Sequence, residues 1–270
     1  MARPRLKRNG KRRRPPDGPQ ADGTAGRGPG QAELGHPRGC LTLRIGGQAN
    51  GRLAAPEASR LVESAREAED DETVRLVVLR GAGADFCAGF EPGVPANLVE
   101  AFAALSKPTL AVIEGRAFDE GLELAMALDL RMAGPGARFA LRQLECGRLP
   151  CFGGTQRLAR LVGPAQALRM LLTGAELEGK DALRLGLVTY CFERRPAFEA
   201  GVESIVRAIV ERAPLALRLA KEAVLHGLDM TLSQGVRLEE DLYALLQTTA
   251  DRAEGIVSFL EKRKPVFKGF

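Results

Sequence analysis

The chain has 270 residues, 45% of them hydrophobic, and a formal net charge of +5, so it is long enough to bury a sizeable core. The positive charge is confined to residues 1–38, which hold 10 Lys and Arg against 3 Asp and Glu, and residues 39–270 therefore carry a net charge of −2. A folded nucleic-acid-binding protein carries its basic patch on the domain itself, so this distribution argues against nucleic acid as a partner.

No stretch approaches the roughly 18–20 apolar residues that a membrane span needs, and no hydrophobic signal-peptide core follows Met1. The five cysteines are scattered without a Cys-x-x-Cys pair, which is typical of reduced thiols in a cytoplasmic protein. The two histidines, His36 and His226, lie far apart in the sequence, so a zinc site is not expected.

Residues 1–38 are rich in Arg, Pro and Gly and nearly free of large apolar side chains. Such a segment cannot bury enough surface to offset the entropy of ordering it, so we predict a disordered basic tail. The run KRRR at residues 11–14 could bind RNA or anionic lipid. We prefer a solubilising tail, or a translation start assigned too far upstream, because basic runs are usually solvated.

From residue 40 the pattern becomes one of alternating strands and helices. Four segments have the pattern of strands, the first alternating as an edge strand would and the second fully buried: residues 41–45, 74–79, 109–113 and 129–133. Three segments have helical spacing: residues 56–70, 98–105 and 121–128. This alternation predicts right-handed crossovers and a mostly parallel sheet, which is an α/β fold.

Beyond Gly163 the sequence is helical in character. Six helices separated by Gly or Pro are predicted there: residues 164–172, 179–185, 197–211, 215–225, 232–247 and 252–262. We therefore divide the chain into a tail at 1–38, an α/β core at 39–195 and a helical C-terminal region at 196–270.

The loop GAGAD at residues 81–85 follows a buried strand and invites a dinucleotide-binding interpretation. It lacks the third glycine of G-x-G-x-x-G, because Phe86 stands there, and no acidic residue ends a following strand. A partial glycine motif is a weak signal, so we disfavour it.

Four blocks of the chain carry a more specific pattern: VRLVVLRGAGADFCAGF (residues 74–90), GRAFDEGLELAMALDLRMA (115–133), ARFALRQLECGRLPCFGGTQRLARLVG (137–163) and EGIVSFLEKRKPVFKG (254–269). Together they closely resemble the crotonase superfamily, the enoyl-CoA hydratases and isomerases, and the resemblance covers residues 39–270. It implies the ClpP/crotonase-like fold of repeated ββα units. It also implies that residues 196–270 form a trimerisation region of a homotrimer or hexamer.

The resemblance implies an acyl-CoA thioester as substrate, with coenzyme A as part of that substrate and no separate cofactor, and a role in fatty acid metabolism. Members of the superfamily develop negative charge on the thioester oxygen and stabilise it with two backbone N–H groups, an oxyanion hole. The corresponding donors here are the N–H groups of Phe90 and Glu120. A backbone donor tolerates a change of side chain.

The first departure from the family pattern is Asp119-Glu120-Gly121, where typical members carry three glycines. Asp119 could cap the following helix while the Glu120 side chain points outward. Alternatively, the two acidic side chains add bulk and negative charge at the oxyanion hole and impair it.

The second departure concerns the two glutamates that hydratases of the superfamily use. Glu123 keeps the first, but Gln143 replaces the second, and an amide cannot exchange a proton at neutral pH. Glu123 could act alone in isomerisation, activate water for slow hydration or hydrolysis, or work with Glu120 as a relocated second carboxylate. Two alternatives remain: a catalytically weak or inactive acyl-CoA-binding protein, and Glu123 as a solvated first-turn glutamate.

For coenzyme A, the resemblance places the Ala88 carbonyl near the adenine and Lys262 near a phosphate. The run EKRK at residues 261–264 could equally be a solvated helix end. The 16 residues between Phe90 and Lys107 are fewer than relatives usually have, which predicts a more open acyl pocket.

Overall fold

Two sheets organise residues 32–35 and 39–270, the part of the chain that this computed structural model describes. The larger sheet has the strand order β1-β2-β3-β4-β6-β9 and the smaller one β5-β7-β8. The strands of the larger sheet are β1 (Ala32–Gly35), β2 (Cys40–Ile45), β3 (Leu76–Gly81), β4 (Thr109–Ile113), β6 (Leu130–Ala133) and β9 (Tyr190–Cys191). Those of the smaller sheet are β5 (Arg116–Phe118), β7 (Arg138–Ala140) and β8 (Leu177–Glu178).

The larger sheet is parallel from β2 to β9, as the alternation of strands and helices predicts. The prediction of an edge strand at residues 41–45 is wrong, because β1 pairs antiparallel with β2 on its outer side. The tail predicted at residues 1–38 is likewise wrong at Ala32–Gly35, which form that strand. The rest of the predicted tail lies outside the described residues.

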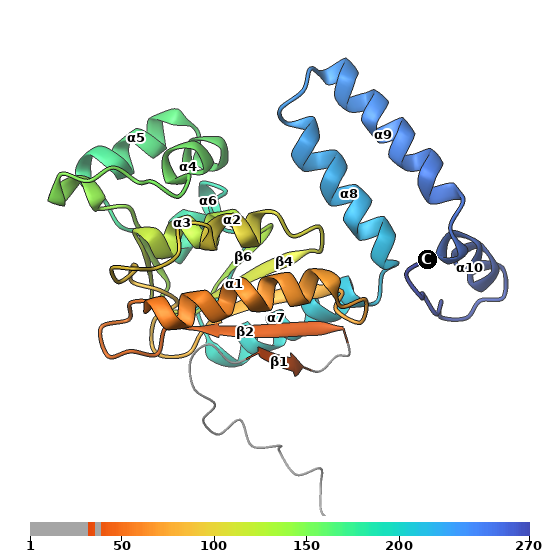
Figure 1. The fold of residues 1–270 in the computed structure, drawn as a ribbon, viewed down its shortest axis with the longest axis horizontal. Coiled ribbons are helices and arrows are strands. Elements are labelled where there is room, and N and C mark those ends of the chain that lie inside the picture. The colour runs from red at the N-terminus through yellow and green to blue at the C-terminus, as the bar shows by residue number, and fades with distance from the viewer. Residues whose placement is uncertain (1–31, 36–38) are drawn as a thin grey trace, which may run out of the picture.

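Helices cover the larger sheet on both faces (Figure 1). Helices α1 (Ala55–Asp70), α2 (Leu98–Ala103) and α3 (Glu120–Ala127) lie over one face, and α7 (Arg195–Val210) packs on the other. The remaining helices are the 3₁₀ helix Gln143–Cys146, α4 (Gly154–Val162), α5 (Pro164–Thr173), α6 (Gly179–Arg184), α8 (Pro214–Gly227), α9 (Leu232–Gln247) and α10 (Ala250–Leu260). The predicted helices all form, α9 with the predicted bounds and the others with ends shifted by a few residues, and α4 and the 3₁₀ helix are additions to them.

The strands β3 and β4 are apolar on both faces because each face packs against a helical layer. Val77 and Leu79 belong to the large core beneath α1, α2 and α3. Their neighbours Leu76 and Val78 point the other way and pack in a second core with Phe198 of α7. A side-chain period of two therefore places successive residues in two different cores.

The last three helices form an arm that projects from the sheet body (Figure 1). Helices α8 and α9 pack against each other as a hairpin, and none of the side chains of α9 is buried. Large apolar side chains are exposed along the arm, and they include Val224, Leu225, Leu228, Leu232, Val236, Tyr243, Leu245, Phe259 and Leu260. Among the described helices, none is long and apolar enough to cross a bilayer.

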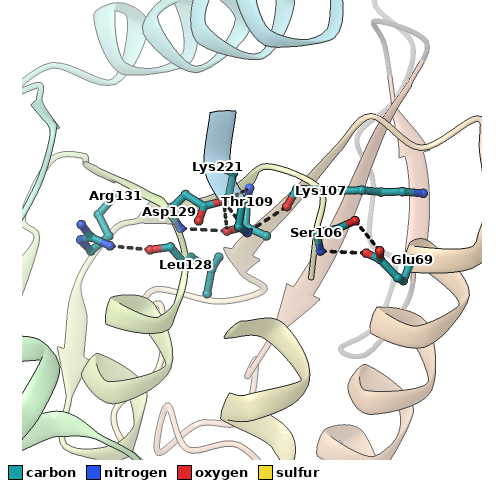
Figure 2. Close-up of polar contacts among 8 residues, drawn as sticks. All are labelled: Glu69, Ser106, Lys107, Thr109, Leu128, Asp129, Arg131 and Lys221. Atoms are coloured by element: carbon teal, nitrogen blue, oxygen red, sulfur yellow. Dashed lines mark hydrogen bonds and ion pairs between the residues drawn. The ribbon is translucent and has the colours of Figure 1, made fainter. Parts of the chain in front are cut away.

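A polar cluster at the amino ends of β4 and β6 fixes the base of this arm (Figure 2). The Asp129 carboxylate accepts hydrogen bonds from the Thr109 N–H at 2.8 Å, the Thr109 hydroxyl at 2.9 Å and the Lys221 ammonium of α8 at 2.8 Å. The Lys107 ammonium donates to the carbonyls of Ala68 and Asp71 at the end of α1, at 2.6 Å each. Lys107 therefore binds the C-terminus of α1, where a cation is favourable. Lys221 attaches α8 to Asp129 at the end of the sheet.

The Lys221→Met variant tests this attachment. The side chains of Lys221 and Asp129 are only 11% and 22% exposed, so removing the cation leaves a largely buried carboxylate without its charge partner. We expect the free energy of unfolding, measured by urea denaturation, to fall by roughly 2–3 kcal/mol. Lys180→Met, on the exposed Lys180–Glu193 pair, is the control and should leave the unfolding midpoint unchanged. Equal effects of the two variants would contradict the assignment.

Glu57 is a second charged group inside the fold, at the start of α1. It is buried and accepts a hydrogen bond from the Gly46 N–H at 2.7 Å, and burial raises its pKa to about 7. Between its unfolded pKa near 4.5 and this value, the folded state holds a proton that the unfolded state has lost. Stability that is present at pH 4.5 is therefore lost as the pH rises toward 7.

We expect Glu57→Gln to remove that loss. Relative to the variant, the wild type should lose roughly 2 kcal/mol of unfolding free energy between pH 5 and pH 8, after allowance for solvent screening. Urea denaturation of both proteins across this pH range measures the difference. Parallel stability curves would show that Glu57 titrates normally.

Candidate active site

The loop after β3 places the Phe90 N–H at the centre of the site. The Ala88 N–H donates to the Gly51 carbonyl at 2.7 Å, and the Leu53 N–H donates to the Gly89 carbonyl at 3.0 Å. Gly89 has a φ of +122°, and a Cβ there would lie 3.1 Å from the Glu120 carboxylate, so a glycine suits this turn. These contacts direct the Phe90 N–H toward the first turn of α3.

The first turn of α3 lies directly against that loop. The Phe118 N–H donates to the Cys87 carbonyl at 2.9 Å, and a Cβ on Gly121 would stand 2.1 Å from the Cys87 oxygen. Gly121 is therefore required for the approach of the two segments. The N–H of Glu120 has no hydrogen-bond acceptor within the described residues. The structure thus brings the two predicted oxyanion donors, Phe90 and Glu120, onto facing segments.

The side chains of Asp119 and Glu120 do not lie as expected if Asp119 capped α3 and Glu120 pointed outward. Asp119 has a φ of +51°, which is unfavourable for a non-glycine residue, and its carboxylate makes no cap bond to α3. It accepts instead from the Arg142 N–H at 2.6 Å. The Glu120 side chain is buried. The interpretation in which Asp119 caps the helix and Glu120 points outward is therefore wrong.

The Glu120 carboxylate occupies the vicinity of the oxyanion donor. One carboxylate oxygen, Oε2, accepts from the Phe90 N–H at 3.3 Å. The other, Oε1, accepts from the Arg148 guanidinium at 2.8 Å. A carboxylate thus lies beside one of the two predicted oxyanion donors.

Glu123 is completely buried one turn further along α3. Its Oε2 accepts from the N–H groups of Phe152 at 2.7 Å and Gly154 at 2.8 Å, at the start of α4. Burial raises the pKa of Glu123, the N–H donors oppose this, and the charge of Glu120 adds to it. A solvated first-turn glutamate is excluded, and the raised pKa lets this carboxyl group hold a proton more readily than an exposed glutamate does.

Gln143 lies beside Glu123 and is also buried. Its Nε2 donates to Glu123 Oε1 at 2.9 Å. Its Oε1 is buried without a hydrogen-bond partner in the described chain. Such an acceptor is unfavourable unless a donor reaches it, so it is available to a water or a hydroxyl of a ligand.

A cavity of about 790 Å³ is lined by the loop that binds Glu123, but not by Glu123 or Gln143 themselves. It extends from the Cys151–Gly153 loop, whose Phe152 N–H binds Glu123, toward the ends of α2, α3 and α8. Apolar residues such as Val99 and Met126 share its wall with arginines, including Arg157. Its volume lies in the range of small-molecule sites. In the part of the chain that is described, no three His, Cys, Asp or Glu side chains are grouped to hold a metal ion.

The two residues predicted to contact coenzyme A are not brought together. Ala88 is in the loop beside Phe90 and is buried. Lys262 follows α10, which lies across the molecule from α3 (Figure 1). Within one chain, Lys262 is therefore remote from the other predicted site residues.

Sequence reasoning missed the residues that hold the two glutamates. Arg148 binds Glu120, and the N–H groups of Phe152 and Gly154 bind Glu123. The pair Gly153-Gly154 at the start of α4 is the signal that could have indicated the second set, because a helix N-terminus presents free N–H groups to an anion. Arg148 lies in a loop with no comparable signal.

A crotonase-type fold with a buried carboxylate beside two converging N–H segments defines the class of protein. The family model described as "Enoyl-CoA hydratase/isomerase" matches residues 95–269. The chain is 29% identical to the enoyl-CoA hydratase of Bacillus anthracis, whose crystal structure superimposes with a TM-score of 0.84 over 89% of this chain and 99% of that one. The chain belongs to the enoyl-CoA hydratase/isomerase family of the crotonase superfamily.

Curated relatives agree with this assignment. The chain is 42% identical over 166 residues to the Arabidopsis thaliana protein "Probable enoyl-CoA hydratase 2, mitochondrial", and this match spans 62% of the chain and 55% of that protein. It is 35% identical over 223 residues to the 2,3-dehydroadipyl-CoA hydratase of Escherichia coli K12, spanning 78% of the chain and 87% of the relative.

Proposed function

We propose that the protein is an acyl-CoA enzyme of the enoyl-CoA hydratase/isomerase type in which Glu123 is the single acid–base residue. The observation that carries the proposal is the buried Glu123 carboxylate, held by two N–H groups of the α4 start and by Gln143. The reactivity attributed to the 2,3-dehydroadipyl-CoA hydratase by its name supports double-bond chemistry on an acyl-CoA. Coenzyme A is then part of the substrate, and no separate cofactor takes part.

In this proposal the thioester oxygen binds between the N–H groups of Phe90 and Glu120. Each such donor contributes about 2.7–4 kcal/mol to stabilising the enolate. The raised pKa of Glu123 allows it to remove a proton and to return the same proton. Isomerisation needs no other acid, because the proton leaves one carbon and enters another.

Hydration places a further demand on this single carboxylate. Glu123 takes a proton from water as the oxygen adds to the β-carbon, and the same proton must then reach the α-carbon. Gln143 cannot supply it, but its unpartnered Oε1 can hold the attacking water. Glu120 is a poor second acid, because Phe90 and Arg148 already bind its carboxylate.

A second candidate function is acyl-CoA binding with little or no catalysis. Two observations favour it: Gln143 stands where a second carboxylate is usual, and the Glu120 carboxylate lies against the Phe90 N–H. This alternative keeps the fold and the binding of the thioester and removes the turnover.

We further propose that the protein assembles as a homotrimer or hexamer through the arm formed by α8, α9 and α10. We also propose that it acts in the cytoplasm and has a role in fatty acid metabolism. The exposed apolar side chains of the arm support the assembly, since such patches mark interaction surfaces. Assembly would also allow Lys262 of one copy to approach the site of another.

Turnover of crotonyl-CoA, followed by the loss of the conjugated thioester absorbance, tests the catalytic proposal. Glu123→Gln should lower the rate by about 10²–10⁴-fold, because it removes the only acid–base group. Gln143→Glu should raise hydration by about 10²-fold, because it supplies the second one. Glu145→Gln, in the same 3₁₀ helix and exposed, should leave the rate unchanged.

An unchanged rate in Glu123→Gln would refute the catalytic assignment. Binding of crotonyl-CoA without turnover in the wild type, together with turnover in Gln143→Glu, would support the second candidate instead.

Sedimentation equilibrium tests the assembly. The wild type should have the mass of three or six copies, and Phe259→Glu should dissociate it, because the charge would be buried at an apolar contact. Glu67→Lys, on the exposed face of α1, should leave the mass unchanged. A monomeric wild type would rule out the arm as a self-association surface.

A further inference from the structure

The Glu120 residue contributes to the site in two opposing ways. Its backbone N–H, which has no acceptor in the described chain, is one of the two groups that can bind a thioester oxygen. Its side chain reaches across to the other group, the Phe90 N–H, with Oε2 at 3.3 Å. The same residue therefore provides one donor and covers the other.

Two features of the protein hold the side chain in this position. Asp119, with its φ of +51°, sets the direction in which the chain enters α3. The Arg148 guanidinium binds Oε1 at 2.8 Å from the opposite side. Glu120 is 5% exposed, so its carboxylate fills space inside the site and does not lie in solvent.

The contact with Phe90 is weaker than the contact with Arg148. A separation of 3.3 Å is at the long end for an N–H donor, whereas 2.8 Å is typical of a charge-assisted bond. The Arg148 side chain is 54% exposed and lies on a surface loop. The carboxylate can therefore leave Phe90 and keep its ion pair, if Arg148 moves outward with it.

We propose that the Glu120 carboxylate is an internal competitor for the oxyanion hole, which an acyl-CoA carbonyl must displace before it can bind to Phe90. In the closed arrangement Glu120 binds Phe90 and Arg148. In the open arrangement Glu120 stays with Arg148, and the thioester oxygen takes its place at the Phe90 N–H. The inference rests on the proposed function in one respect, that the Phe90 N–H receives the thioester carbonyl.

The consequence is a binding penalty that depends on the carbonyl. The apparent dissociation constant rises in inverse proportion to the fraction of molecules that are open. A ligand with the same CoA and chain but without the carbonyl oxygen does not need Phe90 and does not meet this penalty. Comparing two such ligands isolates the effect of Glu120 from all other contacts.

The experiment measures dissociation constants of butyryl-CoA and of its thioether analogue butyl-CoA by titration calorimetry. The proteins are the wild type, Glu120→Gly, Glu120→Gln and the control Glu145→Gln. We expect Glu120→Gly to bind butyryl-CoA about tenfold more tightly than the wild type does, the effect of freeing one hydrogen-bond donor, and butyl-CoA with unchanged affinity. Glu145→Gln should match the wild type for both ligands.

Glu120→Gln protects the test against a loss of folding in the glycine variant. It keeps the volume of the side chain and removes the negative charge, so a smaller gain for butyryl-CoA alone is expected. A gain that is equal for both ligands, or no gain in either variant, would overturn the proposal.

The outcomes separate this inference from the proposed function. If the wild type already prefers butyryl-CoA over butyl-CoA as strongly as Glu120→Gly does, the oxyanion hole stands and Glu120 is not a competitor. If no protein distinguishes the two ligands, or none binds them, Phe90 does not receive the carbonyl, and both the oxyanion hole and the competitor are wrong.

Discussion

The close approach of two backbone segments is the constraint on which the site depends. The Cys87 carbonyl and Gly121 are so near that a single Cβ would collide with the oxygen. This approach places the Phe90 N–H opposite the first turn of α3, and it brings Glu120 and Glu123 into the same small volume. Behind the first segment, β3 contributes side chains to both cores, so this loop cannot move away from α3 without disturbing them.

The hydrogen bonds of Glu123 connect three elements that are separate in the sequence. The carboxylate belongs to α3, its amide partner to the 3₁₀ helix at Gln143, and its two N–H donors to the start of α4. Burial and the charge of Glu120 raise its pKa, while the α4 donors limit the rise. The result is a buried carboxyl group that is fixed in position and has a raised pKa.

The sequence predicts this architecture where the signal is local and repeated. The strand Thr109–Ile113 and the helix Leu232–Gln247 have the predicted bounds, because apolar runs and helical periodicity extend over their whole length. The strands β8 and β9 have two residues each and carry no such pattern. The orientation of Glu120 depends on Arg148, 28 positions later, and no local pattern encodes a contact of that kind.

The collision at Gly121 also limits how this region can change in evolution. Positions 119 and 120 accommodate acidic side chains, since one accepts a hydrogen bond from the Arg142 N–H and the other binds Arg148. No side chain fits at position 121, because its Cβ would lie 2.1 Å from the Cys87 carbonyl oxygen. Substitutions at positions 119 and 120 can therefore alter the charge of this loop, whereas position 121 has to remain glycine.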